Sequence, residues 1–225
     1  MPNISDNIAR VRERIAGAAL GAGRDPGEVV LVAVTKTVPA ERVREAVAVG
    51  VEDLGESYFQ EARDKMAAVG GTVRWHFIGH LQSNKARGVV GRFSLVHGID
   101  SMRLAREVGR RAAAANLEQP VLLEVRLDPA GSKWGVDPSA VGAVAAEVAS
   151  TSGLRLDGLM GMPPQARIPD DSRPAFALLR GLFEALPAAN RRVLSMGMSA
   201  DYEAAIREGA THVRVGTAIF GARQP

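Results

Sequence analysis

Short apolar stretches alternate along this chain with longer segments in which apolar residues recur at every third or fourth position. The short stretches are typical of buried parallel strands, and the longer segments are typical of amphipathic helices. We expect strands over residues 29–36, 51–54, 73–78, 95–98, 121–127, 154–160, 193–196 and 212–215. The helices between them are predicted over residues 39–49, 57–69, 82–90, 101–116, 137–150, 172–186 and 200–208.

One more amphipathic helix precedes the first strand, because Ile4, Ile8, Val11 and Ile15 are spaced by three or four residues. Eight strands that alternate with helices predict an α/β fold, a single (β/α)8 barrel of the TIM type with an extra N-terminal helix. We expect one domain over residues 1–225, in which residues 1–22 form the helix and residues 29–221 form the barrel.

An open doubly wound sheet is the alternative arrangement of the same elements. Such a sheet would be expected to carry a glycine fingerprint directly after its first strand. This chain has Lys36, Thr37 and Val38 at that place. The pattern therefore favours the barrel.

Composition narrows the range of functions. The net charge is +3 with acidic and basic residues interspersed, so we expect no binding to nucleic acid. Without cysteine the chain has neither disulfides nor thiolate chemistry, and no metal site is predicted. The N-terminus does not resemble a signal peptide, and no apolar run is long enough to span a membrane. We expect a cytoplasmic protein that acts as a monomer.

Lys36 is the first candidate for chemistry. The chain has four lysines, and only Lys36 closes an apolar run, LVAVTK. Desolvation of an ammonium group at the end of an apolar strand is costly, so this position favours the neutral amine. A neutral amine attacks an aldehyde to form a Schiff base.

The ends of the last two strands carry residues suited to an anion. The loop SMGMSAD contains Gly197 and Ser199, which precedes a predicted helix, and the last strand ends at Gly216 and Thr217. Helix N-termini and glycine-rich loops at this end of a barrel often hold phosphate. Since the last strand of a closed barrel lies beside the first, Lys36 would lie next to this anion cradle.

A Schiff-base lysine beside a phosphate cradle fits a phosphorylated aldehyde, and pyridoxal 5′-phosphate is the obvious candidate. Arg214 is expected on the same strand face as His212 and Gly216, whereas Val213 and Val215 should face outward. Because an arginine cannot accept a hydrogen bond, it would keep a neighbouring pyridine nitrogen unprotonated. The ring would then be a poor electron sink.

Structural roles are the alternatives for each of these residues. Ser199 can be a helix cap and the glycines can be turn residues. Arg214 can pair with Glu124 inside the barrel, and Lys36 can extend its amine to solvent. The histidines lack the spacing of metal ligands, so packing is the better interpretation for His76, His80, His97 and His212. The conjunction at one barrel end favours the site.

Several segments together resemble the pyridoxal phosphate homeostasis protein family, namely VAVTKTVP, GESYFQEA, WHFIGHLQSNKAR, GSKWG, GLMGMPP and LSMGMSADYEAAI with GATHVRVGTAIFGAR. The resemblance implies the barrel of the alanine racemase N-terminal domain without its second domain. Members of the family bind pyridoxal phosphate covalently and have no established turnover. They are thought to buffer the cofactor and deliver it, which makes apoenzymes that depend on it possible partners.

The resemblance also assigns roles to residues of this chain. Lys36 matches the Schiff-base lysine, and Arg214 matches the residue near the pyridine nitrogen. The phosphate ligands match Ser199, Gly216 and Thr217, and two further pocket positions match Met198 and His76. Lys133 matches a lysine that could receive or relay the cofactor, or could be a solvated loop residue. Departures from the common pattern fall at Ser57, Val38 and Arg126.

Three functions remain for comparison. The leading hypothesis is a non-catalytic carrier of pyridoxal phosphate. The second is an amino-acid racemase of the alanine racemase type, which needs an acid on the ring face opposite the lysine. The chain has only Tyr58 and Tyr202 as tyrosines and no evident residue for that face, so efficient racemization is disfavoured. The third is a Schiff-base aldolase for sugar phosphates, in which Arg214 would have no purpose.

Overall fold

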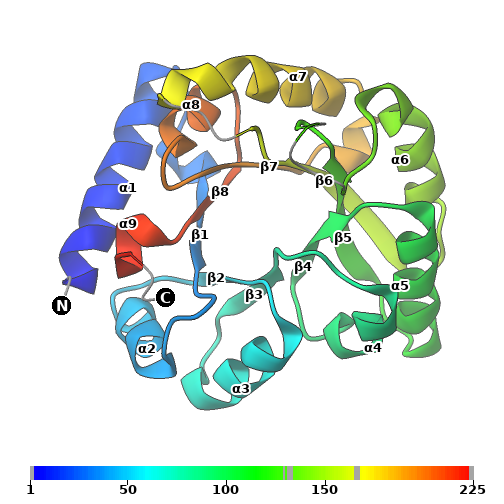
Figure 1. The fold of residues 1–225 in the computed structure, drawn as a ribbon, viewed down its shortest axis with the longest axis horizontal. Helices are drawn as coiled ribbons and strands as arrows, with labels where there is room; N and C mark the ends of the chain where they lie inside the picture. The colour runs from blue at the N-terminus through cyan, green and yellow to red at the C-terminus, as the bar shows by residue number, and fades with distance from the viewer. Residues whose placement is uncertain (1–2, 129, 131–133, 165–167, 223–225) are drawn as a thin grey trace.

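The computed structural model describes residues 3–128, 130, 134–164 and 168–222. Its strands form a closed parallel barrel in which each strand pairs with the next along the chain and β8 pairs with β1 (Figure 1). The strands are β1 (Val30–Val34), β2 (Asp53–Glu56), β3 (Arg74–Phe77), β4 (Leu95–Ile99), β5 (Gln119–Val125), β6 (Leu154–Gly161), β7 (Val193–Met198) and β8 (His212–Val215). The predicted (β/α)8 fold is confirmed.

Helices surround the barrel and alternate with its strands (Figure 1). They are α1 (Ile4–Gly21), α2 (Ala40–Ala48), α3 (Phe59–Val69), α4 (Ala86–Val89), α5 (Met102–Ala114), α6 (Val141–Ala149), α7 (Arg173–Glu184), α8 (Tyr202–Arg207) and α9 (Thr217–Phe220). Short 3-10 turns are η1 (Pro26–Glu28), η2 (Ser83–Lys85), η3 (Pro138–Ala140), η4 (Pro169–Ser172) and η5 (Ala188–Asn190). Among the described helices, none combines the length and the apolar character that a membrane span requires.

The extra helix α1 lies beside α8 and α9 at the end of the chain (Figure 1). The Asn3 side chain caps its first turn by accepting the Asp6 N–H at 3.3 Å. One face of α1 is buried, and Asn7 Nδ2 on this helix donates to the Ile219 carbonyl of α9 at 2.9 Å. This bond joins the two ends of the described chain on the same side of the barrel.

The register of β1 against β8 shows which side chains point into the barrel. Val32 pairs with Arg214, so these two residues share the interior face. Val213 and Val215 are buried in the layer between strands and helices, as predicted. Inside the barrel, a small apolar cluster comprises Leu95, Leu122, Met160 and Val193. Several hydrogen-bonded polar side chains also lie in the interior, among them His76, His97, Ser195 and Arg214.

Three of the strand ends that differ from the prediction are explained by hydrogen bonds near them. β1 ends at Val34, two residues before Lys36: the buried Thr35 hydroxyl donates to Glu56 Oε1 on β2, and Thr37 has a positive φ of 63°, which is not compatible with a strand. β5 begins two residues earlier than expected, since the buried Gln119 amide donates to the Phe93 carbonyl and stabilises a polar strand start. β2 starts only at Asp53, because the Val51 N–H still donates to the carbonyl of Ala46 in α2.

Helix α9 was not predicted from the sequence. The segment TAIFG is apolar and follows β8, so it resembles a continuation of the strand. In the structure the chain turns at Gly216, and the N–H groups of Ile219 and Phe220 donate back to the Gly216 carbonyl. The end of β8 is therefore also the start of a helix, and this brings backbone N–H groups to the C-terminal end of the barrel.

Candidate functional site

Lys36 lies in the turn after β1, at the C-terminal end of the barrel, and is half-buried. It lines a cleft of about 540 Å³ whose other walls come from the loops after β2, β3 and β6. Among its lining residues are Ser57, Tyr58, His80 and Met162. The predicted Schiff-base lysine is thus at the end of the barrel where such sites form. Ser57, one of the departures from the family pattern, lines the same cleft.

Both neighbours of Lys36 are held by a buried ion cluster, which we define as Lys65, Glu56 and Glu61. Lys65 Nζ, on α3, lies 2.8 Å from Glu56 Oε1 and 2.5 Å from Glu61 Oε1. The Thr35 carbonyl also accepts from Lys65 Nζ, and the Thr35 hydroxyl donates to Glu56 Oε1 at 2.6 Å.

On the other side of Lys36, the Thr37 N–H donates to Glu61 Oε1 at 2.5 Å. Thr37 has a positive φ, which residues with a side chain rarely adopt, so this bond stabilises an unfavourable turn. Burial raises the pKa of Glu56, although hydrogen bonds from Lys65 and Thr35 oppose the shift. Sequence reasoning missed the cluster; the spacing of Glu61 and Lys65 by four residues on a helix is the signal that could have indicated it.

The residues predicted to form the anion cradle lie in the loop after β7 and at the start of α9. Ser199 Oγ accepts the N–H groups of Gly216 at 3.1 Å and Ala218 at 3.5 Å. A Cβ atom on Gly216 would lie 3.3 Å from the Val34 carbonyl, so this glycine is packed against the end of β1. Thr217, exposed at the first position of α9, is its next neighbour. Ser199, Gly216 and Thr217 therefore meet close to the strand that leads to Lys36.

The loop that carries Ser199 requires a glycine at position 197. Gly197 has a φ of 88°, and a Cβ atom there would lie 2.9 Å from the Tyr202 Cα atom. The next residue, Met198, donates its N–H to Asp201 Oδ1 at 2.8 Å, while its side chain is 39% exposed. Gly197 therefore has a structural role, since its positive φ and the close packing of α8 both exclude a side chain there.

Arg214 is buried in the barrel below the cradle. Its Nη1 donates to Ser195 Oγ at 2.6 Å and its Nη2 donates to the Gly161 carbonyl at 3.2 Å. Burial lowers the pKa of Arg214 to about 10, and the charges of Glu124 and Asp201 oppose this shift. Arg214 is still protonated at neutral pH. The alternative of an ion pair with Glu124 is not what the structure has, since these N–H groups bind Ser195 and Gly161.

Glu124, at the C-terminal end of β5, is buried and titrates unusually. Burial raises its pKa to about 7, the Asp100 charge adds to the shift, and the Arg214 charge opposes it. Between its ordinary pKa of 4.5 and a pKa of about 7, the folded chain binds a proton that the unfolded chain releases. The free energy of unfolding should therefore fall as the pH rises through this window, by about 3 kcal/mol from this group.

Glu124→Gln should remove this contribution and make unfolding less dependent on pH. Urea unfolding of both proteins at pH 5 and pH 8 measures it, because the difference between them isolates Glu124 from other titrating groups. Equal pH dependence in the two proteins would contradict the raised pKa.

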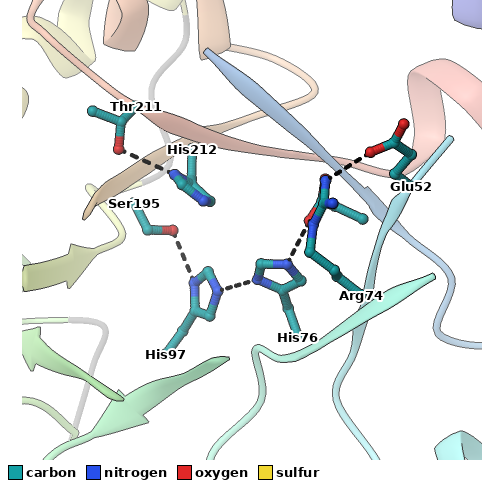
Figure 2. Close-up of polar contacts among 8 residues, drawn as sticks. Glu52, Arg74, His76, His97, Ser195, Thr211 and His212 are labelled. Atoms are coloured by element: carbon teal, nitrogen blue, oxygen red, sulfur yellow. Dashed lines mark hydrogen bonds and ion pairs between the residues drawn. The ribbon is translucent and has the colours of Figure 1, made fainter. Parts of the chain in front are cut away.

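Three of the four histidines lie close together, with ring centroids 5.2 Å apart for His76 and His97 and 6.0 Å apart for His76 and His212, and the fourth, His80, lies apart from them. His76 and His97 are buried in the barrel and bonded to each other at 3.0 Å, and His212 Nδ1 lies 3.1 Å from Thr211 Oγ (Figure 2). His80 is at the surface, where its ring stacks on Trp134 with centroids 3.7 Å apart. Within the described part of the chain, no group of residues is arranged to hold a metal ion.

His76 is therefore placed deeper than the rest of the predicted site. Its Nε2 lies 2.9 Å from Asp53 Oδ1, so both of its ring nitrogens are engaged inside the barrel. Lys133 is outside the described residues. The other two departures lie apart from the cradle: Val38 packs against the core, and Arg126 pairs with Asp137 at 3.0 Å.

Known proteins resemble this chain in sequence and in structure. The sequence matches the alanine racemase N-terminal domain family over residues 2–224. It is 46% identical over 224 residues to a pyridoxal phosphate homeostasis protein of Pseudomonas aeruginosa, covering 99% of this chain and 97% of that one. It is also similar to PipY of Synechococcus elongatus, solved with PLP bound, with a TM-score of 0.84, 34% identity and coverage of 97% and 100%.

More distant structures share only the fold. Alanine racemase from Bartonella henselae superimposes with a TM-score of 0.76 at 13% identity, and the match covers 97% of this chain but 58% of that one. The relatives at higher identity are matched along nearly their whole length. The chain belongs to the pyridoxal phosphate homeostasis protein family, which has the barrel of the alanine racemase N-terminal domain.

Proposed function

We propose that this protein binds pyridoxal 5′-phosphate covalently through Lys36 and acts in the cytoplasm as a carrier that holds and releases the cofactor. The observation that supports it most is that Gly216, at the end of β8, packs against Val34 at the end of β1, two residues before Lys36. The names of its relatives, and the PLP bound in PipY, point the same way. When bound, the cofactor supplies an aldehyde carbon that reacts with an amine.

The residues of the site fit the chemical groups of this cofactor. Ser199 Oγ and the N–H groups of Gly216 and Thr217 would hold the phosphate, because N–H and O–H donors at a helix start favour an anion. The Lys36 amine would take the aldehyde. Arg214, charged and unable to accept a hydrogen bond, would face the ring nitrogen and keep it unprotonated. Met198 would line the pocket, and contact of His76 with the ligand stays a prediction.

The phosphate should account for much of the affinity. Ser199→Ala removes an oxygen that organises two N–H groups, so we expect pyridoxal phosphate to bind roughly tenfold more weakly. Binding of pyridoxal, which lacks the phosphate, should be weak in the parent protein and nearly unchanged by the substitution. Equilibrium titration of both proteins with both compounds measures this. An equal loss for the two compounds would place Ser199 away from the phosphate.

A racemase is the second candidate, and one observation favours it. Tyr58 is 60% exposed and lines the same cleft as Lys36, so its hydroxyl could exchange a proton there. The other tyrosine, Tyr202, is 1% exposed in the core and is unsuited to that role. We favour the carrier, since a single side chain that is 60% exposed and directly precedes α3 is poorly positioned for proton transfer.

One experiment separates the two functions. The purified protein is loaded with pyridoxal phosphate, and two activities are then followed: exchange of the α-hydrogen of L-amino acids in deuterated water, and activation of a pyridoxal phosphate-dependent apoenzyme. The carrier predicts activation of the apoenzyme without hydrogen exchange. Exchange that is lost in Tyr58→Phe would establish the racemase instead. Elution of the loaded protein as a monomer is a further expectation of the carrier.

A further inference from the structure

The interior of this barrel is unusually polar along one side. TIM barrels are normally filled by branched apolar side chains. Here the apolar cluster of Leu95, Leu122, Met160 and Val193 fills only one part. Hydrogen-bonded side chains from β2, β3, β4, β7 and β8 fill another part, and most of them are drawn in Figure 2. Buried polar groups are costly unless each is satisfied, so the order of their bonds is informative.

One end of this interior set is an acidic residue at the start of β2. Asp53 accepts two bonds from Arg74, Nε to Oδ1 at 2.8 Å and Nη2 to Oδ2 at 2.7 Å. His76 Nε2 lies 2.9 Å from Asp53 Oδ1. Burial acts to raise the pKa of Asp53, but bonds from His76 and Arg74 outweigh burial and lower it to about 2. Asp53 is therefore ionised and can only accept, so His76 Nε2 carries a hydrogen.

From His76 the contacts continue across the barrel to Arg214. His76 Nδ1 lies 3.0 Å from His97 Nε2, and His97 Nδ1 lies 3.0 Å from Ser195 Oγ. Arg214 Nη1 donates to the same Ser195 oxygen at 2.6 Å. All four residues are buried. The contacts thus link Asp53, near the N-terminal end of the strands, to an arginine near their C-terminal end.

The direction of the bonds follows from two facts: arginine only donates, and among the contacts of Ser195 Oγ only His97 Nδ1 can accept its O–H. Since Ser195 Oγ accepts from Arg214, its single O–H is available for His97 Nδ1, its other contact. His97 then carries its hydrogen on Nε2 and donates it to His76 Nδ1. Burial holds the pKa of His97 well below its ordinary value, which agrees with a neutral ring.

The bonds at the Asp53 end agree with this direction. Because His76 Nδ1 accepts from His97, the ring has its one hydrogen on Nε2, which is what the ionised Asp53 requires. Along this chain of contacts each residue donates to the next, in the order Arg214, Ser195, His97, His76 and Asp53. The reverse direction would leave the Ser195 O–H without an acceptor among its contacts in the described structure.

We propose that Arg214 is positioned from inside the barrel by this one-way chain of hydrogen bonds, made by Ser195, His97, His76 and Asp53. The inference rests on the proposed function, because it gives the positioned guanidinium a cofactor ring to face. The chain fixes the acceptor for one Arg214 amino group, and the Gly161 carbonyl fixes the other. The other three N–H bonds of the guanidinium are thereby oriented by the protein before any ligand arrives.

The first test uses the protein without cofactor. Nitrogen-15 NMR of the imidazole rings should show His76 and His97 as neutral rings with hydrogen on Nε2. In Ser195→Ala, the spectrum of His97 should change, while that of His80, which pairs with Asp100 outside the chain, should stay the same. Hydrogen on His97 Nδ1 in the parent protein, or a His97 spectrum unaffected by Ser195→Ala, would overturn the chain. This outcome does not depend on cofactor binding.

The second test asks whether the chain acts through Arg214. Ser195→Ala should weaken pyridoxal phosphate binding about fivefold and shift the absorbance of the bound cofactor in the direction that Arg214→Met shifts it. In the Arg214→Met background, Ser195→Ala should add nothing, as expected for residues that act as one unit. Additive effects of the two substitutions would show that Ser195 acts independently, and the positioning role would be wrong. A protein that has the predicted tautomers but binds no pyridoxal phosphate would instead refute the proposed function.

Discussion

Replacing Lys65 with methionine should lower the free energy of unfolding by about 3–5 kcal/mol. The Lys65 side chain is 8% exposed and its amine contacts two carboxylates, one of them on the completely buried Glu56. Methionine keeps most of the volume but leaves the Glu56 charge without its cation. Chemical denaturation followed by circular dichroism measures the loss.

The matched control for this substitution is Lys85→Met. Lys85 is an exposed lysine that lines the same cleft as Lys36, and its replacement should change the free energy of unfolding by less than about 0.5 kcal/mol.

Lys65→Met should also slow covalent capture of pyridoxal phosphate, since Thr35 and Thr37 lose the cluster that holds the turn between them. A stable variant that is captured at the parent rate would show that the cluster is not needed.

Lys36→Ala should abolish covalent binding of pyridoxal phosphate while leaving weak reversible binding. The Schiff base needs the amine, but the cradle formed by Ser199 and Gly216 does not depend on Lys36 and should still hold the phosphate. Dialysis should therefore remove the cofactor from the variant and not from the parent protein. Absorbance before and after dialysis measures this difference.

Lys85→Ala is the control for chemistry, because it removes another amine from the same cleft. It should retain the cofactor through dialysis as the parent protein does. If Lys36→Ala retained it as well, while Lys85→Ala lost it, the Schiff-base lysine would be misassigned.

The barrel was predictable because its signals are local. Each strand is a short apolar run and each helix has its own periodicity, so the order of elements could be derived before any contact was known. Strand ends were less predictable. Thr35 and Gln119 decide where β1 ends and where β5 begins, and they do so through side-chain bonds to partners far along the chain. The sequence around each residue contains no sign of those partners.

Parts of the candidate site were likewise predictable from the sequence, and other parts were not. Closure of the barrel was enough to predict that the end of β1, which leads to Lys36, lies beside the end of β8, which leads to Gly216. The interior bonds of Arg214 were not foreseen, because Ser195, His97 and Asp53 come from three other strands and are brought together only by the register. Isolated histidines inside strands resemble packing residues, and only their mutual distances indicate a chain.

The most direct test of the central claim is to identify the residue that carries the cofactor. The purified protein is incubated with pyridoxal phosphate, reduced with borohydride and digested, and the modified peptide is sequenced by mass spectrometry. We expect a single major adduct on Lys36, among the four lysines of the chain. An adduct mainly on Lys65, Lys85 or Lys133, or no adduct under conditions that saturate the protein, would contradict a Schiff base at the end of β1.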